Sequence, residues 1–136
     1  MDEREKIRLQ YEIEILKTLE HPNIVKLYEV FEDKDYIYIV TELCEGGELF
    51  DVILEKQCFN EKDAASITKQ TLNAVAYCHS MKVAHRDLKP ENILLDKQNQ
   101  ESIKIIDFGT SQIFQEGQKM HQTYGTAYYI APEVLK

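Results

Sequence analysis

The sequence has few of the residues that disulfide frameworks and zinc sites need, and it has no long apolar run. Its three cysteines, Cys44, Cys58 and Cys78, are far apart and form no C-x-x-C pair, and its histidines do not cluster with them. This odd, widely spaced set argues against a disulfide framework and a zinc site, and it fits a reducing, intracellular setting. No stretch approaches the roughly 20 apolar residues of a membrane span, and the N-terminus contains no apolar signal core. We therefore expect a soluble, cytoplasmic protein.

Positive charge is also scarce. Lys and Arg number 16 against 24 Asp and Glu, which gives a net charge of −8, and no basic patch of the kind that binds nucleic acid is visible. We therefore expect no nucleic-acid partner. The acidity has two interpretations, because it would attract cationic partners such as a basic peptide, or would only keep the chain soluble. With 43% hydrophobic residues in a chain of 136, the composition is that of one small globular domain.

Hydrophobic spacing predicts a mixture of helices and strands. In chain order the expected elements are a helix at 2–20, hairpin strands at 24–31 and 36–43, helices at 48–55 and 60–80, and short strands at 93–95 and 103–106 separated by a polar turn. Pro22 ends the first helix because proline disfavours helical geometry in the residue before it. Residues 82–92 and the stretch after residue 106 are predicted to be irregular. A loop as long as the second is usually functional.

Three ordered motifs carry the strongest signal in the chain. The stretch H-R-D-L-K-P-E-N begins at His85 and ends at Asn92, D-F-G follows at residues 107–109, and A-P-E follows at residues 131–133. A single tripeptide would carry little weight, but three motifs in this order and at workable spacing are specific. The set is that of the protein kinases, and the chain resembles the middle of a Ser/Thr kinase domain over residues 1–136. Residues 125–135 are most similar to the calcium-dependent kinases of the calmodulin-dependent group.

The resemblance implies an α+β, two-lobed protein-kinase fold that is incomplete in both lobes. Residues 1–43 would be the remnant of the N-terminal lobe, and residues 44–136 would be the first half of the C-terminal lobe. The implied elements are the regulatory helix of the small lobe with its following hairpin, the first two helices of the large lobe, the catalytic loop, a strand pair and the activation segment.

The implied activity is transfer of the γ-phosphate of ATP to a protein Ser or Thr, with Mg²⁺ as cofactor. Such phosphoryl transfer needs positioning and charge neutralisation more than covalent help. Asp87 would orient the substrate hydroxyl and accept its proton, and Lys89 would offset charge on the transferring phosphate. Asn92 and Asp107 would supply the hard oxygen ligands that Mg²⁺ prefers. The plainer alternative for Asp87, taken alone, is a solvated loop carboxylate.

The resemblance assigns further residues to nucleotide and substrate binding. Glu12 matches the glutamate that pairs with a small-lobe lysine, and Glu14 is the fallback if the register is shifted. The other assignments are Thr41 as the gatekeeper behind the adenine, the Glu42 carbonyl and the Cys44 amide at its edge, Leu94 and Ile106 beneath it, Glu48 at the ribose or a basic substrate side chain, and Glu91 beside basic substrates. The alternative for Glu48 and Glu91 is ordinary surface charge.

The activation segment and the core receive expectations from the same resemblance. Thr126 is expected to hydrogen-bond Asp87 and Lys89, and Gln122 occupies the usual position of the phosphorylated residue, which argues against regulation there. Thr110 follows D-F-G where Leu is common, and in related kinases a β-branched residue there accompanies threonine as the acceptor. The residues matching the packed column that joins the lobes are Leu16, Leu27, His85 and Phe108.

Several kinase features do not occur in these residues. The sequence contains no G-x-G-x-x-G loop, no V-A-I-K lysine and no D-x-[DN]-x-[DN]-G calcium loop. We therefore expect a fragment of a longer kinase that is inactive by itself, with an exposed hairpin at residues 24–43 and any calcium-sensor region outside this chain. Protein substrates with basic residues near the acceptor are the expected partners. The alternative is a non-catalytic, kinase-derived binding or decoy module.

Overall fold

The computed structural model describes residues 3–97 and 101–135. The first residue of the first predicted helix and the centre of the polar turn predicted before residue 103 lie outside these ranges. The helices are α1 (Glu3–Thr18), α2 (Leu49–Lys56), α3 (Glu61–Ser80) and the short 3-10 turns η1 (Pro90–Asn92) and η2 (Pro132–Val134). The strands are β1 (Leu27–Glu32), β2 (Ile37–Thr41), β3 (Val83–Ala84), β4 (Ile93–Leu95), β5 (Ile103–Ile105) and β6 (Gln112–Ile113). These elements confirm the predicted α+β class.

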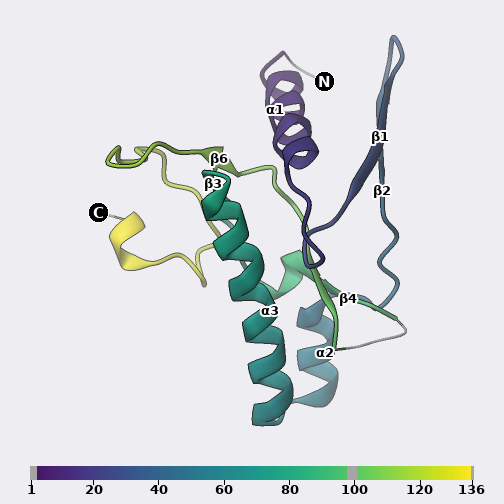
Figure 1. Cartoon of the computed structure of the whole chain (residues 1–136), viewed down its shortest axis with the longest axis vertical. Helices are drawn as coiled ribbons and strands as arrows, with labels where there is room; N and C mark the ends of the chain where they lie inside the picture. The colour runs from purple at the N-terminus through teal and green to yellow at the C-terminus, as the bar shows by residue number, and fades with distance from the viewer. Residues whose placement is uncertain (1–2, 98–100, 136) are drawn as a thin grey trace.

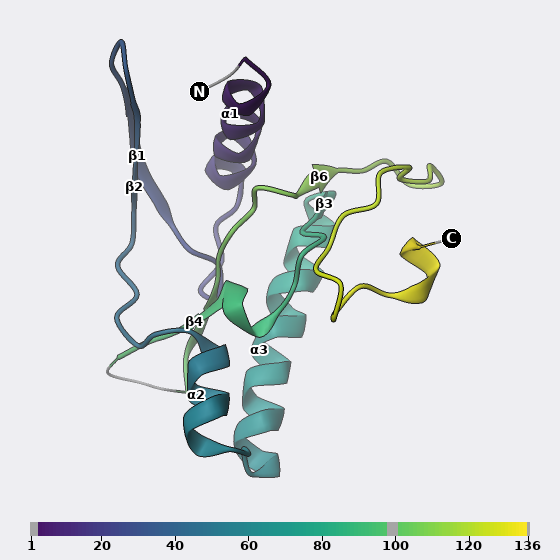
Figure 2. The ribbon, with the colours of Figure 1, turned by 180° about the vertical axis from the view of Figure 1, so that it is seen from behind.

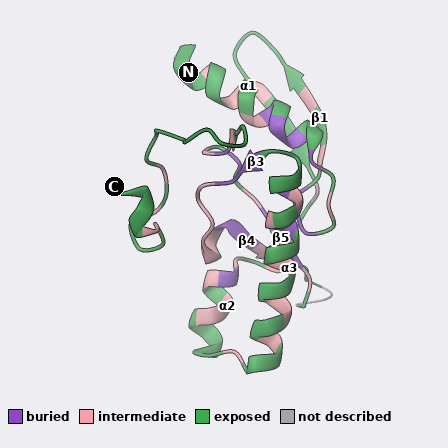
Figure 3. Cartoon of the chain, turned by 60° about the vertical axis from the view of Figure 1, so that its left-hand side comes forward, coloured by how far each residue is buried: buried purple, intermediate pink, exposed green. Residues whose placement is uncertain are grey.

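Helix α1 and the β1–β2 hairpin lie at one end of the structure, and α2 and α3 lie at the other, with β4 between them (Figure 1). The reverse view shows η1 above the upper end of α2, which it contacts (Figure 2). Buried residues gather where α1 ends and where β3, β4 and β5 pass α3 (Figure 3). The largest fully buried side chains are Phe108, Ile15, Ile24, Leu95, Ile103, Ile105 and Val83.

Helix α1 is anchored to the strand that leads to the D-F-G motif. It buries Ile13, Ile15 and Leu16 on one face. The chain after it then pairs with β5, because the Val25 N–H donates to the Ile105 carbonyl over 3.0 Å and the Ile105 N–H donates to the Asn23 carbonyl over 2.8 Å. Backbone pairing of this kind fixes the end of α1 relative to residue 107.

The β1–β2 hairpin forms a two-stranded antiparallel sheet, as the sequence predicts. The Asp33 carboxylate closes its turn by accepting hydrogen bonds from the N–H groups of Asp35 and Tyr36. These bonds, with one from the Tyr38 hydroxyl, lower the pKa of Asp33. Large hydrophobic side chains remain exposed along the hairpin and its exit, namely Tyr28, Phe31, Tyr36, Tyr38, Ile39, Val40 and Leu43. This exposure is the open hairpin expected from the sequence.

Helix α3 begins at the predicted cap, because Asn60 accepts a hydrogen bond from the Asp63 N–H over 2.9 Å. It packs against β3 and β5, burying Ala74 and Cys78, and leaves Leu72 exposed. Burial raises the pKa of the Cys78 thiol to about 11.

Two segments predicted to be irregular contain regular structure, so that prediction was wrong in part. Residues 82–92 include β3 and η1, and the stretch after residue 106 includes β6 and η2. Strand β3 pairs with β6 through Val83 with Ile113 and Ala84 with Gln112. Strands of two residues show no periodicity, and their partners are distant in sequence, so local patterns could not find them.

Candidate active site

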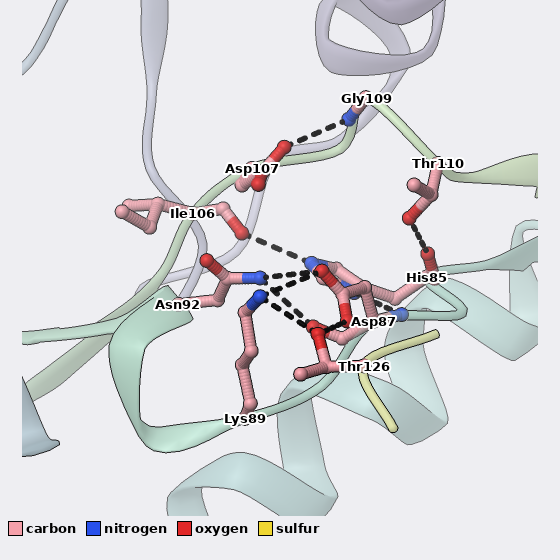
Figure 4. Close-up of polar contacts among 9 residues, drawn as sticks. All are labelled: His85, Asp87, Lys89, Asn92, Ile106, Asp107, Gly109, Thr110 and Thr126. Carbon is pink, nitrogen blue, oxygen red and sulfur yellow. Dashed lines mark hydrogen bonds and ion pairs between the residues drawn. The ribbon is translucent and has the colours of Figure 1, made fainter. Parts of the chain in front are cut away.

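The Asp87 carboxylate lies at the centre of a hydrogen-bonded cluster formed by two segments of the chain (Figure 4). Its Oδ1 accepts a hydrogen bond from the Thr126 hydroxyl over 2.7 Å, and its Oδ2 lies 3.2 Å from the Lys89 ammonium. The Asn92 amide donates to Oδ2 over 3.3 Å and to the Asp87 carbonyl over 2.9 Å. Lys89 also donates to the Thr126 hydroxyl oxygen over 2.8 Å. The predicted contacts of Thr126 with Asp87 and Lys89 are confirmed.

This cluster favours the ionised form of Asp87. Burial by itself would raise the pKa of the Asp87 carboxyl, but hydrogen bonds from Thr126, Lys89 and Asn92 and the Lys89 charge act in the opposite direction and outweigh it. The pKa therefore lies below its ordinary value of 3.8. At neutral pH the site presents a carboxylate that can orient a hydroxyl group and accept its proton.

The neutral ring of His85 supports the cluster through the backbone of Asp87. Its Nδ1 accepts a hydrogen bond from the Asp87 N–H over 3.2 Å, so its Nε2 carries the proton and donates to the Ile106 carbonyl over 3.0 Å. Burial lowers the pKa of His85, which keeps this tautomer neutral. The ring also meets the edge of Phe108, with centroids 4.8 Å apart. Of the predicted packed column, Leu16, His85 and Phe108 are buried, and Leu27 packs against the core.

Asp107 and Glu12 both lie close to Gly109. The Gly109 N–H donates to Asp107 Oδ1 over 3.2 Å, and a Cβ atom on residue 109 would lie 3.4 Å from Glu12 Oε2. Burial and the nearby Asp107 charge raise the pKa of Glu12. Glu14, the alternative in the sequence, is exposed and forms an ion pair with Lys17. The structure thus brings Glu12, and not Glu14, to the D-F-G motif.

The backbone at Asp107 is strained, with φ at 60°. A left-handed conformation in a residue other than glycine costs about 1 kcal/mol and persists only where the surroundings impose it. In this conformation the Asp107 carboxylate accepts the hydrogen bond from the Gly109 N–H, and both features set the direction of the Asp107 side chain.

Asn92 and Asp107 form a donor set that fits magnesium. The Ile106 N–H donates to the Asn92 carbonyl over 2.9 Å, which places β5 and residue 107 next to η1. Because the Asn92 amide nitrogen faces Asp87, its side-chain oxygen points the other way, toward the side where Asp107 lies (Figure 4). Mg²⁺ is usually held by one or two protein oxygens together with phosphates and water. The described residues contain no group of three His, Cys, Asp or Glu side chains arranged for a metal.

The linker after β2 carries the residues expected at the adenine. Thr41 is exposed, and its hydroxyl donates to the Glu42 carbonyl over 3.3 Å. The Glu42 side chain fixes the linker to the strands below, because it accepts from the Lys26 N–H over 2.8 Å and pairs with Lys104 over 3.0 Å. Cys44 is partly buried, and this burial raises the pKa of its thiol. Sequence analysis missed Lys104, which no motif contains.

Gly46 is a second residue that sequence analysis missed. Its N–H donates to the Leu95 carbonyl over 2.9 Å, and a Cβ atom on residue 46 would lie only 2.2 Å from the same oxygen. Glu48 then pairs with Leu94 as an isolated antiparallel bridge. The linker therefore lies directly on β4, and the Gly-Gly pair at residues 46–47 was the signal that could have revealed this contact.

The remaining predicted residues lie around this cluster. Leu94 and Ile106 are both partly buried, Leu94 in β4 and Ile106 directly after β5. Glu91 lies in η1, against which α2 packs, and its Oε2 is buried without a hydrogen-bond partner among the described residues. Glu91 and Glu48 are thus on the α2 side of the site, while Glu12 and Asp107 are on the α1 side.

Comparison with known families agrees with this geometry. The protein kinase domain family matches residues 1–136, the whole chain. The chain belongs to the protein kinase family. The predicted kinase fold class is thereby confirmed, and Asp87, Asn92 and Asp107 occupy the kinase motifs.

The kinase is similar to calcium-dependent members of the family. It is 55% identical to calcium-dependent protein kinase 4 of Plasmodium berghei over 133 residues, which cover 96% of this chain and 25% of that protein. It is 51% identical to calcium-dependent protein kinase 5 of the same organism, covering 95% of this chain and 23% of that protein. A probable myosin light chain kinase of Dictyostelium discoideum is 50% identical, with 95% and 33% covered. The chain thus spans between about a quarter and a third of the length of these relatives.

Proposed function

We propose that the protein containing this chain transfers the γ-phosphate of ATP to a serine or threonine hydroxyl of protein substrates. The observation that carries this proposal is the ionised Asp87 carboxylate held between Thr126, Lys89 and Asn92. A carboxylate fixed in this way can align a hydroxyl nucleophile and take its proton as the phosphate transfers.

The other site residues have supporting roles in this proposal. Lys89 offsets charge on the transferring phosphate, while the oxygens of Asn92 and Asp107 hold Mg²⁺. The metal, when bound with ATP, neutralises charge on the phosphates. Glu42, Cys44, Leu94 and Ile106 surround the adenine, with Thr41 behind it, and Glu12 pairs with a cation of the N-terminal lobe. Residues 1–43 and 44–136 belong to the two lobes.

Substrates with basic residues near the acceptor fit the charge of the site. The chain carries a net charge of −8, and Glu48 and Glu91 lie on the side of the site that α2 forms. A basic peptide would gain electrostatic attraction to this acidic surface, and more so at low salt. Thr110 donates a hydrogen bond to the His85 carbonyl over 3.2 Å. Because Thr110 is the β-branched residue directly after D-F-G, the proposal includes a preference for threonine over serine as the acceptor.

The test is phosphate transfer by the full-length protein to matched basic peptides that contain Ser or Thr. Asp87→Asn should abolish transfer but retain Mg-ATP binding, whereas Asp107→Ala should lose magnesium-dependent ATP binding as well. Asp35→Asn is the matched control, since Asp35 lies in the exposed turn of the hairpin. Saturable transfer that Asp87→Asn leaves unchanged would contradict the proposal. Partner binding without nucleotide, unaffected by Asp87→Asn, would instead support a non-catalytic binding module.

A further inference from the structure

Strand β6 is held on three sides by side chains and backbone of distant segments. It begins three residues after Gly109 and pairs with β3 on one side. On another side, the Ile113 N–H donates to the Tyr11 hydroxyl over 3.0 Å, joining residues 102 apart. A strand of two residues has little stability of its own, so these outside contacts decide its position.

Arg86 forms the third contact with this region. Its Nη1 donates to the Gln112 side-chain oxygen over 2.7 Å, and its Nε donates to the Thr110 carbonyl over 2.5 Å. The guanidinium also lies over the Tyr124 ring, 4.3 Å from the centroid. Arg86 has a left-handed backbone, with φ at 71°. The arginine before the catalytic aspartate is thus engaged by neutral groups of this chain.

Tyr11 directly precedes Glu12 on α1. Glu12 lies against Gly109, and Tyr11 contacts β6 four residues further along. Both residues line a cavity of about 390 Å³ between α1 and the activation segment, together with Arg86, Gln112 and Tyr124. One turn of α1 therefore touches the start of the activation segment at two points, and a shift or rotation of α1 would break both.

We propose that Tyr11 is a positioning residue that ties α1 to β6, and that Gln112 completes the tie by holding Arg86 without a phosphate group. The tie keeps Glu12, the D-F-G stretch and the catalytic loop in one arrangement. This inference rests on the proposed kinase function. Tyr11 touches neither Asp87 nor the metal ligands in any contact described above, so its effect on the reaction is indirect.

The first test compares Tyr11→Phe with Tyr38→Phe in the full-length protein. Both variants remove one hydroxyl that hydrogen-bonds, but Tyr38 contacts Asp33 in the hairpin turn, far from β6. Tyr11→Phe should speed hydrogen exchange at the Ile113 amide about fivefold, the effect of losing one hydrogen bond. It should also lower kcat by about 3- to 10-fold, because a smaller fraction of the protein holds the active arrangement. Tyr38→Phe should change neither quantity.

The second test uses Gln112. Gln112→Ala should lower kcat, and Gln112→Glu should restore it, because a carboxylate at this position still accepts from Arg86. The melting temperature should shift by similar amounts in Tyr11→Phe and Tyr38→Phe, because each variant loses one hydrogen bond. A merely structural role of Tyr11 would show this change in stability without a change in kcat.

Unchanged exchange at Ile113 in Tyr11→Phe would overturn the inference, as would faster exchange with wild-type kcat. A wild-type protein that neither binds Mg-ATP nor transfers phosphate would overturn the proposed function. If exchange at Ile113 were still faster in Tyr11→Phe in that case, Tyr11 would be a structural contact only, and its positioning role would be overturned as well.

Discussion

The Thr126 hydroxyl donates a hydrogen bond of 2.7 Å to the Asp87 carboxylate, joining two residues that are 39 positions apart. The same hydroxyl oxygen accepts from Lys89 over 2.8 Å. Thr126 belongs to the activation segment and Asp87 to the catalytic loop, so the position of one segment affects the protonation of the other. This relationship makes the pKa of the proposed base depend on the position of the activation segment.

Thr126→Val tests this dependence in the full-length protein. The variant keeps the side-chain shape but removes one hydrogen bond that lowers the pKa of Asp87. The acid limb of the kcat/KM profile should therefore move to higher pH, and kcat should fall by about 10- to 100-fold. Thr123→Val, which removes an exposed hydroxyl from the same segment, is the control. An acid limb at the wild-type pH would contradict the role given to Thr126.

Glu12→Gln is expected to stabilise the chain of residues 1–136 at about pH 7. Burial and the Asp107 charge raise the folded-state pKa of Glu12 above its ordinary value of 4.5. The folded state therefore retains this proton longer than the unfolded state, and the stability it contributes is present below pH 4.5 and lost as the pH rises through the folded-state pKa. Urea unfolding across this pH range measures the effect.

Glu14→Gln is the matched control for this measurement, because Glu14 lies on the exposed face of the same helix and pairs with Lys17 over 3.0 Å. An exposed ion pair contributes little to stability, so this variant should unfold like the wild type at every pH. A Glu12→Gln variant that is less stable than the wild type at neutral pH would contradict the prediction, because the hydrogen bond from the Phe108 backbone would then outweigh burial and the Asp107 charge.

His85 should take up a proton at a lower pH than an ordinary histidine does. Burial lowers its folded-state pKa below the ordinary value of 6.5, against the opposing effects of the Ile106 bond and nearby carboxylates. Between these two pKa values the unfolded state binds more protons, so stability falls as the pH drops below 6.5 and levels off below the folded-state pKa. Nitrogen NMR shifts of the ring should show Nε2 protonated and Nδ1 bare. A ring that titrates at or above 6.5 would contradict the lowered pKa, and a proton on Nδ1 would contradict this tautomer.

Gly46→Ala should destabilise the chain by about 2 to 4 kcal/mol and weaken ATP binding. Its Cβ would meet the Leu95 carbonyl oxygen at 2.2 Å, and both sides of this contact are backbone, so neither can turn away. Separation of the linker from β4 would also move Cys44 and Glu48. Glu45→Ala is the control, since Glu45 is exposed and pairs only loosely with Lys97, at 3.8 Å. A wild-type melting temperature for Gly46→Ala would show that the linker tolerates a shift.

None of the described helices combines the length and apolar character that a membrane-spanning helix needs. Part of the apolar surface on the described part of the chain lies on the hairpin, where Tyr28 and Phe31 are exposed. Further strands beside β1 or β2 would cover this surface and satisfy their edges.

The long helices and the contiguous motifs were accessible from sequence. Helix α3 carries a cap at Asn60 and helical spacing, and both are local properties. Asp87 and Asn92 lie five residues apart in one stretch, and the short η1 turn returns the chain so that their side chains meet. Functional residues that lie within one short stretch of the sequence can be predicted without knowledge of the fold.

Tertiary structure decided the contacts between segments that are distant in sequence. The pairing of β3 with β6, the approach of Gly46 to Leu95 and the tie of Tyr11 to Ile113 have no local pattern. Each depends on how helices and loops pack, because a backbone N–H or carbonyl bonds whichever partner packing brings near, regardless of its residue type. The sequence by itself determined which groups could perform the chemistry, and packing determined which of them are held together.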